Sequence, residues 1–247
     1  MSISMYLGSA YKLPLPDKSV DLIITNPPFF KTEGVYYGGD QKEQLSHGKD
    51  SVKEEYWSNL TTATKEMHRV LKDDGNLLIL VGQGMYPKLN TFEYEHIMYC
   101  TKELGLTLTS EVSWEINQNM FSHENLHTEY QIFRHYTKNE NYIRNPFEIT
   151  NLNPASWRIP YTENNPELAK IGGQGHGFPV ELAMRMIRCF SNPNSIVLDP
   201  FSGTGTVNVA AGLYQRDSVY LDCSEEQYNL AKKRFELFGL TSVEKKA

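Results

Sequence analysis

The sequence has few cysteines, no long apolar run and no excess of basic residues. Its three cysteines, Cys100, Cys189 and Cys223, are far apart and odd in number, which excludes a disulfide framework and a Cys-x-x-Cys metal site. No run approaches the roughly 18 apolar residues that a membrane helix needs. The first residues also lack the basic start and apolar core of a signal peptide. We therefore expect a soluble cytoplasmic protein with no membrane segment and no metal.

The charge balance gives no support to binding nucleic acid through bulk electrostatics. The chain has 24 basic and 30 acidic residues, a net charge of −6, whereas such binders normally carry a basic excess. Between Glu115 and Lys170, seven glutamates outnumber the five lysines and arginines. Steering charge can still be confined to a cleft, so a nucleic-acid function has to be argued from motifs.

The order of apolar runs predicts the fold class. The chain has 247 residues, 40% hydrophobic and 22% charged, which suits one domain over residues 1–247. Short apolar runs alternate with longer amphipathic ones, the pattern of an α/β protein with a mostly parallel, twisted sheet and helices on both faces. Strands are expected at about 20–25, 77–81, 106–114, 129–138, 196–198 and 219–221. Helices are expected at about 51–71, 91–104, 178–190, 207–213 and 224–238, with Gly75 at the exit of the first.

Two stretches break this alternation. Residues 31–50 contain four glycines and no apolar period, which predicts a mobile loop. Residues 139–177 are rich in Asn, Pro and Gly, which predicts a small irregular insertion. Four aromatic residues of these stretches either anchor the chain onto the core or contact bases; they are Tyr36, Tyr37, Trp157 and Tyr161.

A glycine-bearing turn between a predicted strand and a predicted helix favours a nucleotide-like cofactor. Glycines allow the backbone to approach a ligand closely, and the helix start offers free N–H donors. After the next strand comes Asp222, where nucleotide-binding α/β folds place the acid that binds a ribose. The predicted turn consists of Asp199, Pro200, Phe201, Ser202, Gly203, Thr204, Gly205 and Thr206.

The first buried strand ends in Asn26, Pro27, Pro28 and Phe29. Both prolines lack an N–H and fix φ, so this segment could simply stop a strand. It would also leave the Asn26 amide and the Pro27 carbonyl at the carboxyl edge of the sheet, where α/β proteins bind ligands. An acceptor pair beside the Phe29 ring suits a planar base that carries an exocyclic amino group.

Together and in this order, the two motifs resemble the S-adenosylmethionine-dependent, amino-methylating DNA methyltransferases of the N-4/N-6 family. The catalytic motif precedes the cofactor turn, as in the permuted β-type branch. Further segments are similar to the family, and they comprise residues 15–21, 69–75, 175–179 and 225–234. The sequence departs from the family at Gly8-Ser9, where Gly-Asp is common, and at Asn26, where Asp or Ser is commoner.

This resemblance implies a Rossmann-like methyltransferase fold, S-adenosylmethionine as cofactor and double-stranded DNA as partner. It implies that Asn26, Pro27, Pro28 and Phe29 act on a flipped base, and that the turn and Asp222 bind the cofactor. His176, Phe178 and Pro179 would help to hold its methionine end. The insertion at about 139–177 would recognise the target, and the protein would be a monomer or a homodimer.

The resemblance leaves the substrate partly open. Asn26 is closer to the adenine-modifying members, which favours methylation of adenine N6, with cytosine N4 as the alternative. A non-catalytic DNA-binding relative is a second alternative, although it would need neither the turn nor the acid nor the Asn-Pro-Pro-Phe motif. That motif alone also fits methylation of RNA or protein glutamine, and the order of motifs favours DNA.

One competing motif points to a different chemistry. His123, Glu124 and His127 match His-Glu-x-x-His, which binds zinc when it lies on an amphipathic helix. Here the motif follows Asn117-Gln118-Asn119 and precedes an apparent strand that begins near Glu129. We therefore expect a chance match rather than a zinc peptidase.

Overall fold

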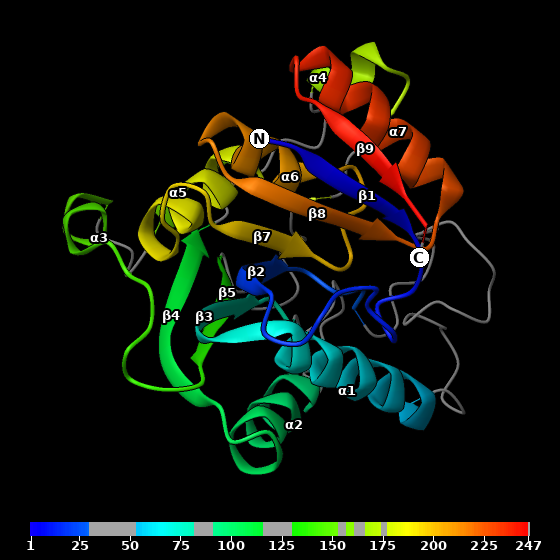
Figure 1. Ribbon diagram of the computed structural model, residues 1–247. Helices are drawn as coiled ribbons and strands as arrows, with labels where there is room; N and C mark the ends of the chain where they lie inside the picture. Colours follow the sequence, from blue (N-terminus) through cyan, green and yellow to red (C-terminus); the bar gives the residue numbers. More distant parts are fainter. Residues whose placement is uncertain are drawn as a thin grey trace, which may run out of the picture.

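The computed structural model describes residues 1–29, 53–81, 91–115, 130–152, 157–160, 166–173 and 177–246. Within these residues a single sheet contains nine strands (Figure 1). The strands are β1 (Ile3–Leu7), β2 (Val20–Thr25), β3 (Leu71–Ile79), β4 (Thr107–Glu115), β5 (Tyr130–Thr137), β6 (Trp157–Arg158), β7 (Ile196–Asp199), β8 (Asp217–Asp222) and β9 (Ser242–Lys245). The helices are α1 (Lys53–Val70), α2 (Phe92–Met98), α3 (Pro146–Leu152), α4 (Pro166–Lys170), α5 (Val180–Phe190), α6 (Thr206–Leu213) and α7 (Glu225–Leu237), with a π-helical segment η2 (Tyr99–Glu103).

The strand order is β6-β4-β5-β3-β2-β7-β8-β1-β9. Only β5 runs antiparallel to its neighbours, β3 and β4, so the predicted α/β class with a mostly parallel sheet is confirmed. The edge strand β9 and its neighbour β1, which pair in parallel, were not predicted from the sequence.

Helices cover both faces of the sheet, as expected (Figure 1). Successive residues of a strand point to opposite faces. Ile23 of β2 therefore packs in a core with residues of α1 and α2, whereas Leu22 and Ile24 pack in a core with residues of α5 and α6. This burial on both sides explains why Leu22, Ile23 and Ile24 of β2 are consecutive apolar residues. None of the helices in the described ranges is long and apolar enough to cross a membrane.

The prediction that Gly75 marks a helix exit is wrong. Helix α1 ends at Val70, β3 begins at Leu71, and Gly75 lies inside that strand. A Cβ on Gly75 would lie 2.8 Å from Leu71 Cδ1 and 3.0 Å from the carbonyl oxygen of Asp21. Glycine is required here because the neighbouring backbone is close, not because the chain turns.

The predicted insertion at 139–177 contains regular structure, namely α3, β6 and α4. Trp157 is 1% exposed, and its Nε1 donates to the Leu152 carbonyl oxygen at 2.9 Å. For Trp157 the anchoring interpretation is therefore confirmed. The loop at 31–50, Tyr161 and the His123–His127 motif lie outside the described residues.

The strand register shows where the insertion runs. Thr137, the last residue of β5, is opposite Asn76 near the start of the parallel core of β3. Trp157 and Arg158 pair with Trp114 and Glu115 at the end of β4. The insertion thus leaves the sheet at the amino edge of the parallel strands and returns to it at their carboxyl edge.

Candidate active site

The predicted site residues lie where the direction of chain winding reverses. From β2 the chain passes through α1 to β3 on one side, and from β7 it passes through α6 to β8 on the other. Because β2 and β7 are parallel neighbours, this is a topological switch point, and α/β sheets bind ligands at the carboxyl ends of strands there. Asn26 follows β2 and Asp199 ends β7.

A hydrogen bond joins these two strand ends. Thr25 Oγ1 donates to Asp199 Oδ1 at 2.7 Å, and both residues are buried. The backbone N–H of Phe201 donates to the same oxygen at 3.0 Å. Burial raises the pKa of the Asp199 carboxyl to about 7, although both hydrogen bonds act to lower it. The strand that leads to Asn26 is thereby tied to the one that leads to the glycine turn.

The segment after β2 presents an unsatisfied acceptor. Asn26 Oδ1 is buried, and within the described residues it has no hydrogen-bond partner. The Pro28 carbonyl oxygen accepts from Tyr56 of α1 at 3.2 Å, and Phe29 packs against the core beneath α5 and α6. A buried acceptor without a partner is costly, so its presence at a switch point favours a ligand that donates to it.

The glycine turn after β7 is built by backbone conformations that favour glycine. Gly203 and Gly205 have φ of 50° and 76°, in the left-handed region. A Cβ on Gly205 would also lie 2.6 Å from the Phe235 ring of α7. Ser202 Oγ donates to the Asp199 carbonyl at 2.6 Å and accepts from the Leu221 N–H at 3.1 Å. The Ser202 side chain thus links the ends of β7 and β8 and fixes the turn between them.

Asp222 reaches this turn from the end of β8. One carboxylate oxygen accepts from the Gly203 N–H at 2.8 Å, and the other accepts from the Ser224 N–H at 2.9 Å. Burial raises the pKa of Asp222, and these backbone hydrogen bonds oppose that shift. Asp222 therefore shapes the turn in addition to any ligand that it binds.

The segment before α5 lies against the same turn. A Cβ on Gly177 would be 3.6 Å from Thr206 Oγ1, and Pro179 is the N-cap of α5. The Phe178 ring is 7% exposed and meets the Phe133 ring edge-on, with centroids 5.3 Å apart. Pro200 is buried, Phe201 packs partly against the core under α1, and His176 lies outside the described residues.

Sequence reasoning missed three residues that support the site: Thr25, Tyr56 and Arg234. Thr25 and Tyr56 look like ordinary core residues in a sequence. Arg234 is a charged residue on the helical face that also contains Ala231 and Phe235, both buried. A charge on a buried face is the signal that could have identified it.

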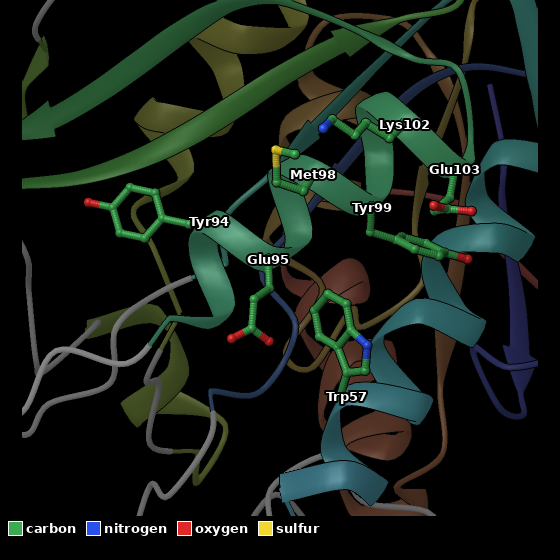
Figure 2. A pocket seen from close by; sticks show the side chains of 7 residues that line it. All are labelled: Trp57, Tyr94, Glu95, Met98, Tyr99, Lys102 and Glu103. Atoms are coloured by element: carbon green, nitrogen blue, oxygen red, sulfur yellow. The ribbon is translucent and has the colours of Figure 1, made fainter.

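A surface groove on the described part of the chain is separate from this constellation. Figure 2 shows its lining side chains, which come from α1, α2 and η2. They are Trp57, Tyr94, Glu95, Met98, Tyr99, Lys102 and Glu103. None of them is a predicted site residue.

The fold and the two turns at the switch point define a Rossmann-like α/β enzyme with a nucleotide-type cofactor. The model of the N6/N4 DNA methylase family matches residues 20–233, so this chain belongs to that family. The resemblance found in the sequence is confirmed: the protein is a DNA methyltransferase, and the expected cofactor, S-adenosylmethionine, is that of its family.

Individual proteins are similar to this chain in sequence or in fold. The type II methyltransferase M.HpaI of Haemophilus parainfluenzae is 26% identical, over 94% of this chain and 74% of its own length. The cytosine-N4-specific PvuII DNA methyltransferase has a similar structure, with a TM-score of 0.78 at 21% identity over 95% of this chain and 86% of that chain. A DNA modification methylase of Thermus thermophilus, TTHA0409, complexed with S-adenosyl-L-methionine, has a TM-score of 0.70 at 24% identity over 98% of this chain and 99% of that chain.

Proposed function

We propose that this DNA methyltransferase methylates the N6 amino group of an adenine flipped out of double-stranded DNA. The observation that carries the proposal is Asn26 Oδ1, a buried acceptor whose hydrogen-bonding capacity the described residues leave unused. It follows β2 at the switch point, beside the cofactor turn. The choice of adenine rests on Asn26 itself, which resembles the adenine-modifying members of the family.

The residues after β2 would activate the amine. S-adenosylmethionine supplies an electrophilic methyl group on a sulfonium, and an aromatic amine is a poor nucleophile because its lone pair is delocalised into the ring. Asn26 Oδ1 and the Pro27 carbonyl would accept the two N–H bonds and draw the nitrogen towards sp³ geometry. As positive charge develops on that nitrogen, both hydrogen bonds strengthen, which is the condition for catalysis.

The neighbouring groups would position this reaction. Phe29 would stack on the flipped base, while the Tyr56 hydroxyl holds the Pro28 carbonyl in place. The fixed acceptors keep the amine in line with the transferred methyl group, so that orientation is set before the reaction begins. The amine proton leaves after transfer, and the motif needs no dedicated base.

The cofactor would lie on the turn from Asp199 to Thr206, with its ribose on Asp222. Two observations support this fit: the left-handed glycines allow close backbone approach, and Asp222 ends the next strand, β8. Residues 176–179, of which Gly177 lies beside Thr206, would hold the methionine end.

We assign target recognition to the later part of the insertion. Residues 157–177 include β6, which joins the sheet at the carboxyl edge where Asn26 lies. Residues 139–145 begin at the opposite edge, where the Ile143 N–H donates to the Asp74 carbonyl at 2.9 Å. Single-residue changes in 157–177 should therefore alter sequence preference more than changes in 139–145.

Identification of the methylated nucleoside tests the proposal. The protein is incubated with duplex DNA and S-adenosylmethionine carrying a labelled methyl group, and the DNA is digested to nucleosides and analysed by mass. Labelled N6-methyldeoxyadenosine is the expected product. Labelled N4-methyldeoxycytidine would establish the alternative substrate, and no label in DNA, with cofactor bound, would establish a non-catalytic relative.

A further inference from the structure

Arg234 of α7 is a fully buried arginine directed at the cofactor turn. Its side chain is 0% exposed. Its Nη1 donates to the Thr204 carbonyl oxygen and to Thr204 Oγ1, both at 3.2 Å, and to Thr206 Oγ1 at 3.0 Å. One nitrogen thus holds three oxygens on the two residues that flank Gly205.

The neighbouring residue of α7 holds the same turn by packing. Phe235 lies under Gly205 so closely that a Cβ would be 2.6 Å from its ring. Gly205 is left-handed, with φ of 76°. Consecutive residues of one helix therefore restrain the turn: Phe235 restrains its centre and Arg234 restrains both sides.

The other side of the guanidinium faces α4, which lies within the proposed recognition residues 157–177. Nη2 of Arg234 is 3.6 Å from Glu167 Oε2 of α4. Residues 166–173 are packed on α7, since Leu168 is 2% exposed and a Cβ on Gly173 would be 2.6 Å from Leu230. Glu167 compensates part of the cost of burying a cation, because its carboxylate opposes the effect of burial on the pKa of Arg234.

A buried ion pair is weak support for stability, because desolvation offsets most of the attraction and apolar residues of similar size often replace it without loss. Stability alone therefore does not account for an arginine at this place. Its hydrogen bonds do, since they fix the conformation of a turn that has to fit a ligand. A turn that is rigid before binding loses less conformational entropy on binding.

We propose that Arg234 is a positioning residue of the cofactor site, which fixes Thr204 and Thr206 in the conformation that binds S-adenosylmethionine, and that Glu167 holds its guanidinium in place. The inference rests on the proposed assignment of the turn to this cofactor. It also links the proposed cofactor turn to residues 166–173, which belong to the insertion that the resemblance assigns to target recognition.

Calorimetric titration with S-adenosylmethionine, in the absence of DNA, tests the proposal alongside urea unfolding. Arg234→Met keeps the side-chain volume and removes the donors, so affinity should fall about 10- to 100-fold, the effect of losing hydrogen bonds from a charged group. Arg234→Lys keeps the charge but not the planar group that spans three oxygens, so its affinity should lie between those of the parent and Arg234→Met. Glu167→Gln should weaken binding by about 2- to 5-fold, as expected for a partly exposed pair.

Matched controls come from a second ion pair between an insertion helix and the body of the domain. Arg188 Nη2 of α5 lies 2.5 Å from Glu148 Oε2 of α3. Arg188→Met and Glu148→Gln should change unfolding without changing cofactor affinity. A purely structural Arg234 would behave in the same way.

The outcomes separate this inference from the proposed function. Unchanged affinity in folded Arg234→Met, while Asp222→Ala weakens binding, would overturn only the role of Arg234. Unchanged affinity in both variants would place the cofactor elsewhere and overturn both proposals. If Arg234→Met does not fold, Arg234→Lys and Glu167→Gln decide the question, and parental affinity in both rejects the inference.

Discussion

The two turns at the switch point differ in how far their polar groups are satisfied. In the cofactor turn the side chains of Ser202, Thr204 and Thr206 all hydrogen-bond within the protein. In the turn after β2, the Oδ1 of Asn26 is buried and has no such partner in the described part of the chain. The polar side chains of the first turn are held by the protein itself, whereas the second turn retains an acceptor for the proposed substrate.

This difference predicts two kinds of variant. Changes in the cofactor turn should disturb conformation and binding together, because each side chain there holds another part of the protein. A change at Asn26 should affect the reaction and leave the rest intact, because its acceptor holds nothing in the described residues. The Thr25–Asp199 hydrogen bond joins the two turns. A change in either of these residues should therefore affect the reaction, the conformation and cofactor binding together.

The largest expected effect belongs to Asn26→Ala. Removing one group that stabilises a transition state typically costs about 10²- to 10³-fold in rate. The variant should bind S-adenosylmethionine like the parent and should lose no more than about 1 kcal/mol of stability, since no described hydrogen bond to Oδ1 is lost. Single-turnover methylation at saturating cofactor measures the rate.

Asn26→Asp is the matched variant for this measurement. It keeps an acceptor of the same size at the same position, and it resembles the commoner adenine-specific form of the motif. Substantial methylation should survive. Methylation by Asn26→Ala at the parental rate would show that Asn26 only ends a strand.

The second prediction concerns pH and the residue that joins the turns. The pKa of Asp199 is about 7 in the folded protein because the carboxyl is buried, against about 4 in an unfolded chain. Between these values the native state binds the proton more tightly, so the Asp199 contribution to stability falls as pH rises, by about 1.4 kcal/mol per pH unit. Above pH 7 the loss levels off.

Asp199→Asn isolates this contribution. Burial lowers the pKa of His96 and His135 to about 4, and these groups destabilise the protein as pH falls below about 6.5, which opposes Asp199. Both histidines are present in the variant and in the parent, so their contribution to the pH dependence cancels when the two stabilities are subtracted. Urea unfolding should show Asp199→Asn close to the parent at about pH 4 and increasingly more stable up to pH 7. A constant difference would contradict the raised pKa.

The third prediction is that Asp222→Ala weakens the binding of S-adenosylmethionine by about 1–3 kcal/mol, because charge-assisted hydrogen bonds are lost. It should also lower stability, since the N–H groups of Gly203 and Ser224 lose their acceptor. Asp217→Ala, at the other end of β8, is the control: Asp217 accepts from the Ser2 N–H and lies away from the turn. Calorimetry that finds parental affinity in folded Asp222→Ala would refute the assignment.

Sequence patterns predicted the central elements because those elements are buried on both faces. Strand β2 contains three consecutive apolar residues, Leu22 to Ile24. Ser224 caps α7 as its spacing indicates, with Ser224 Oγ accepting from the Gln227 N–H at 3.2 Å. Strand β9 was missed because an exposed edge strand needs no apolar run. In β1 the signal was only the alternation of buried Ile3 and Met5 with polar or half-buried neighbours.

The site residues could be placed from motifs, but their connections could not. The bond from Thr25 to Asp199 spans 174 positions in the chain, and no local pattern encodes such a contact. Basic residues near the C-terminal end of a helix usually reflect the helix dipole. Arg234, which follows Lys232 and Lys233, was therefore given no role, although it lies on the buried face of α7. Local chemistry identified the two turns, and tertiary packing determined what supports each of them.

The smallest expected effect is the dependence of DNA binding on salt. The net charge is −6, and exposed Arg158 at the carboxyl edge already pairs with Glu115 at 2.6 Å. With few phosphates neutralised, the slope of log affinity against log salt should be shallow, far from that of a protein with about ten phosphate contacts. Glu115→Gln removes one negative charge beside Arg158, so the slope should steepen by up to about 0.9, the value of one phosphate. Asp73→Asn, which changes the same charge at the Lys18 pair, near the amino edge, should leave the slope unchanged. A steep parental slope, or equal slopes for both variants, would show that lysines or arginines other than Arg158 contact the DNA phosphates.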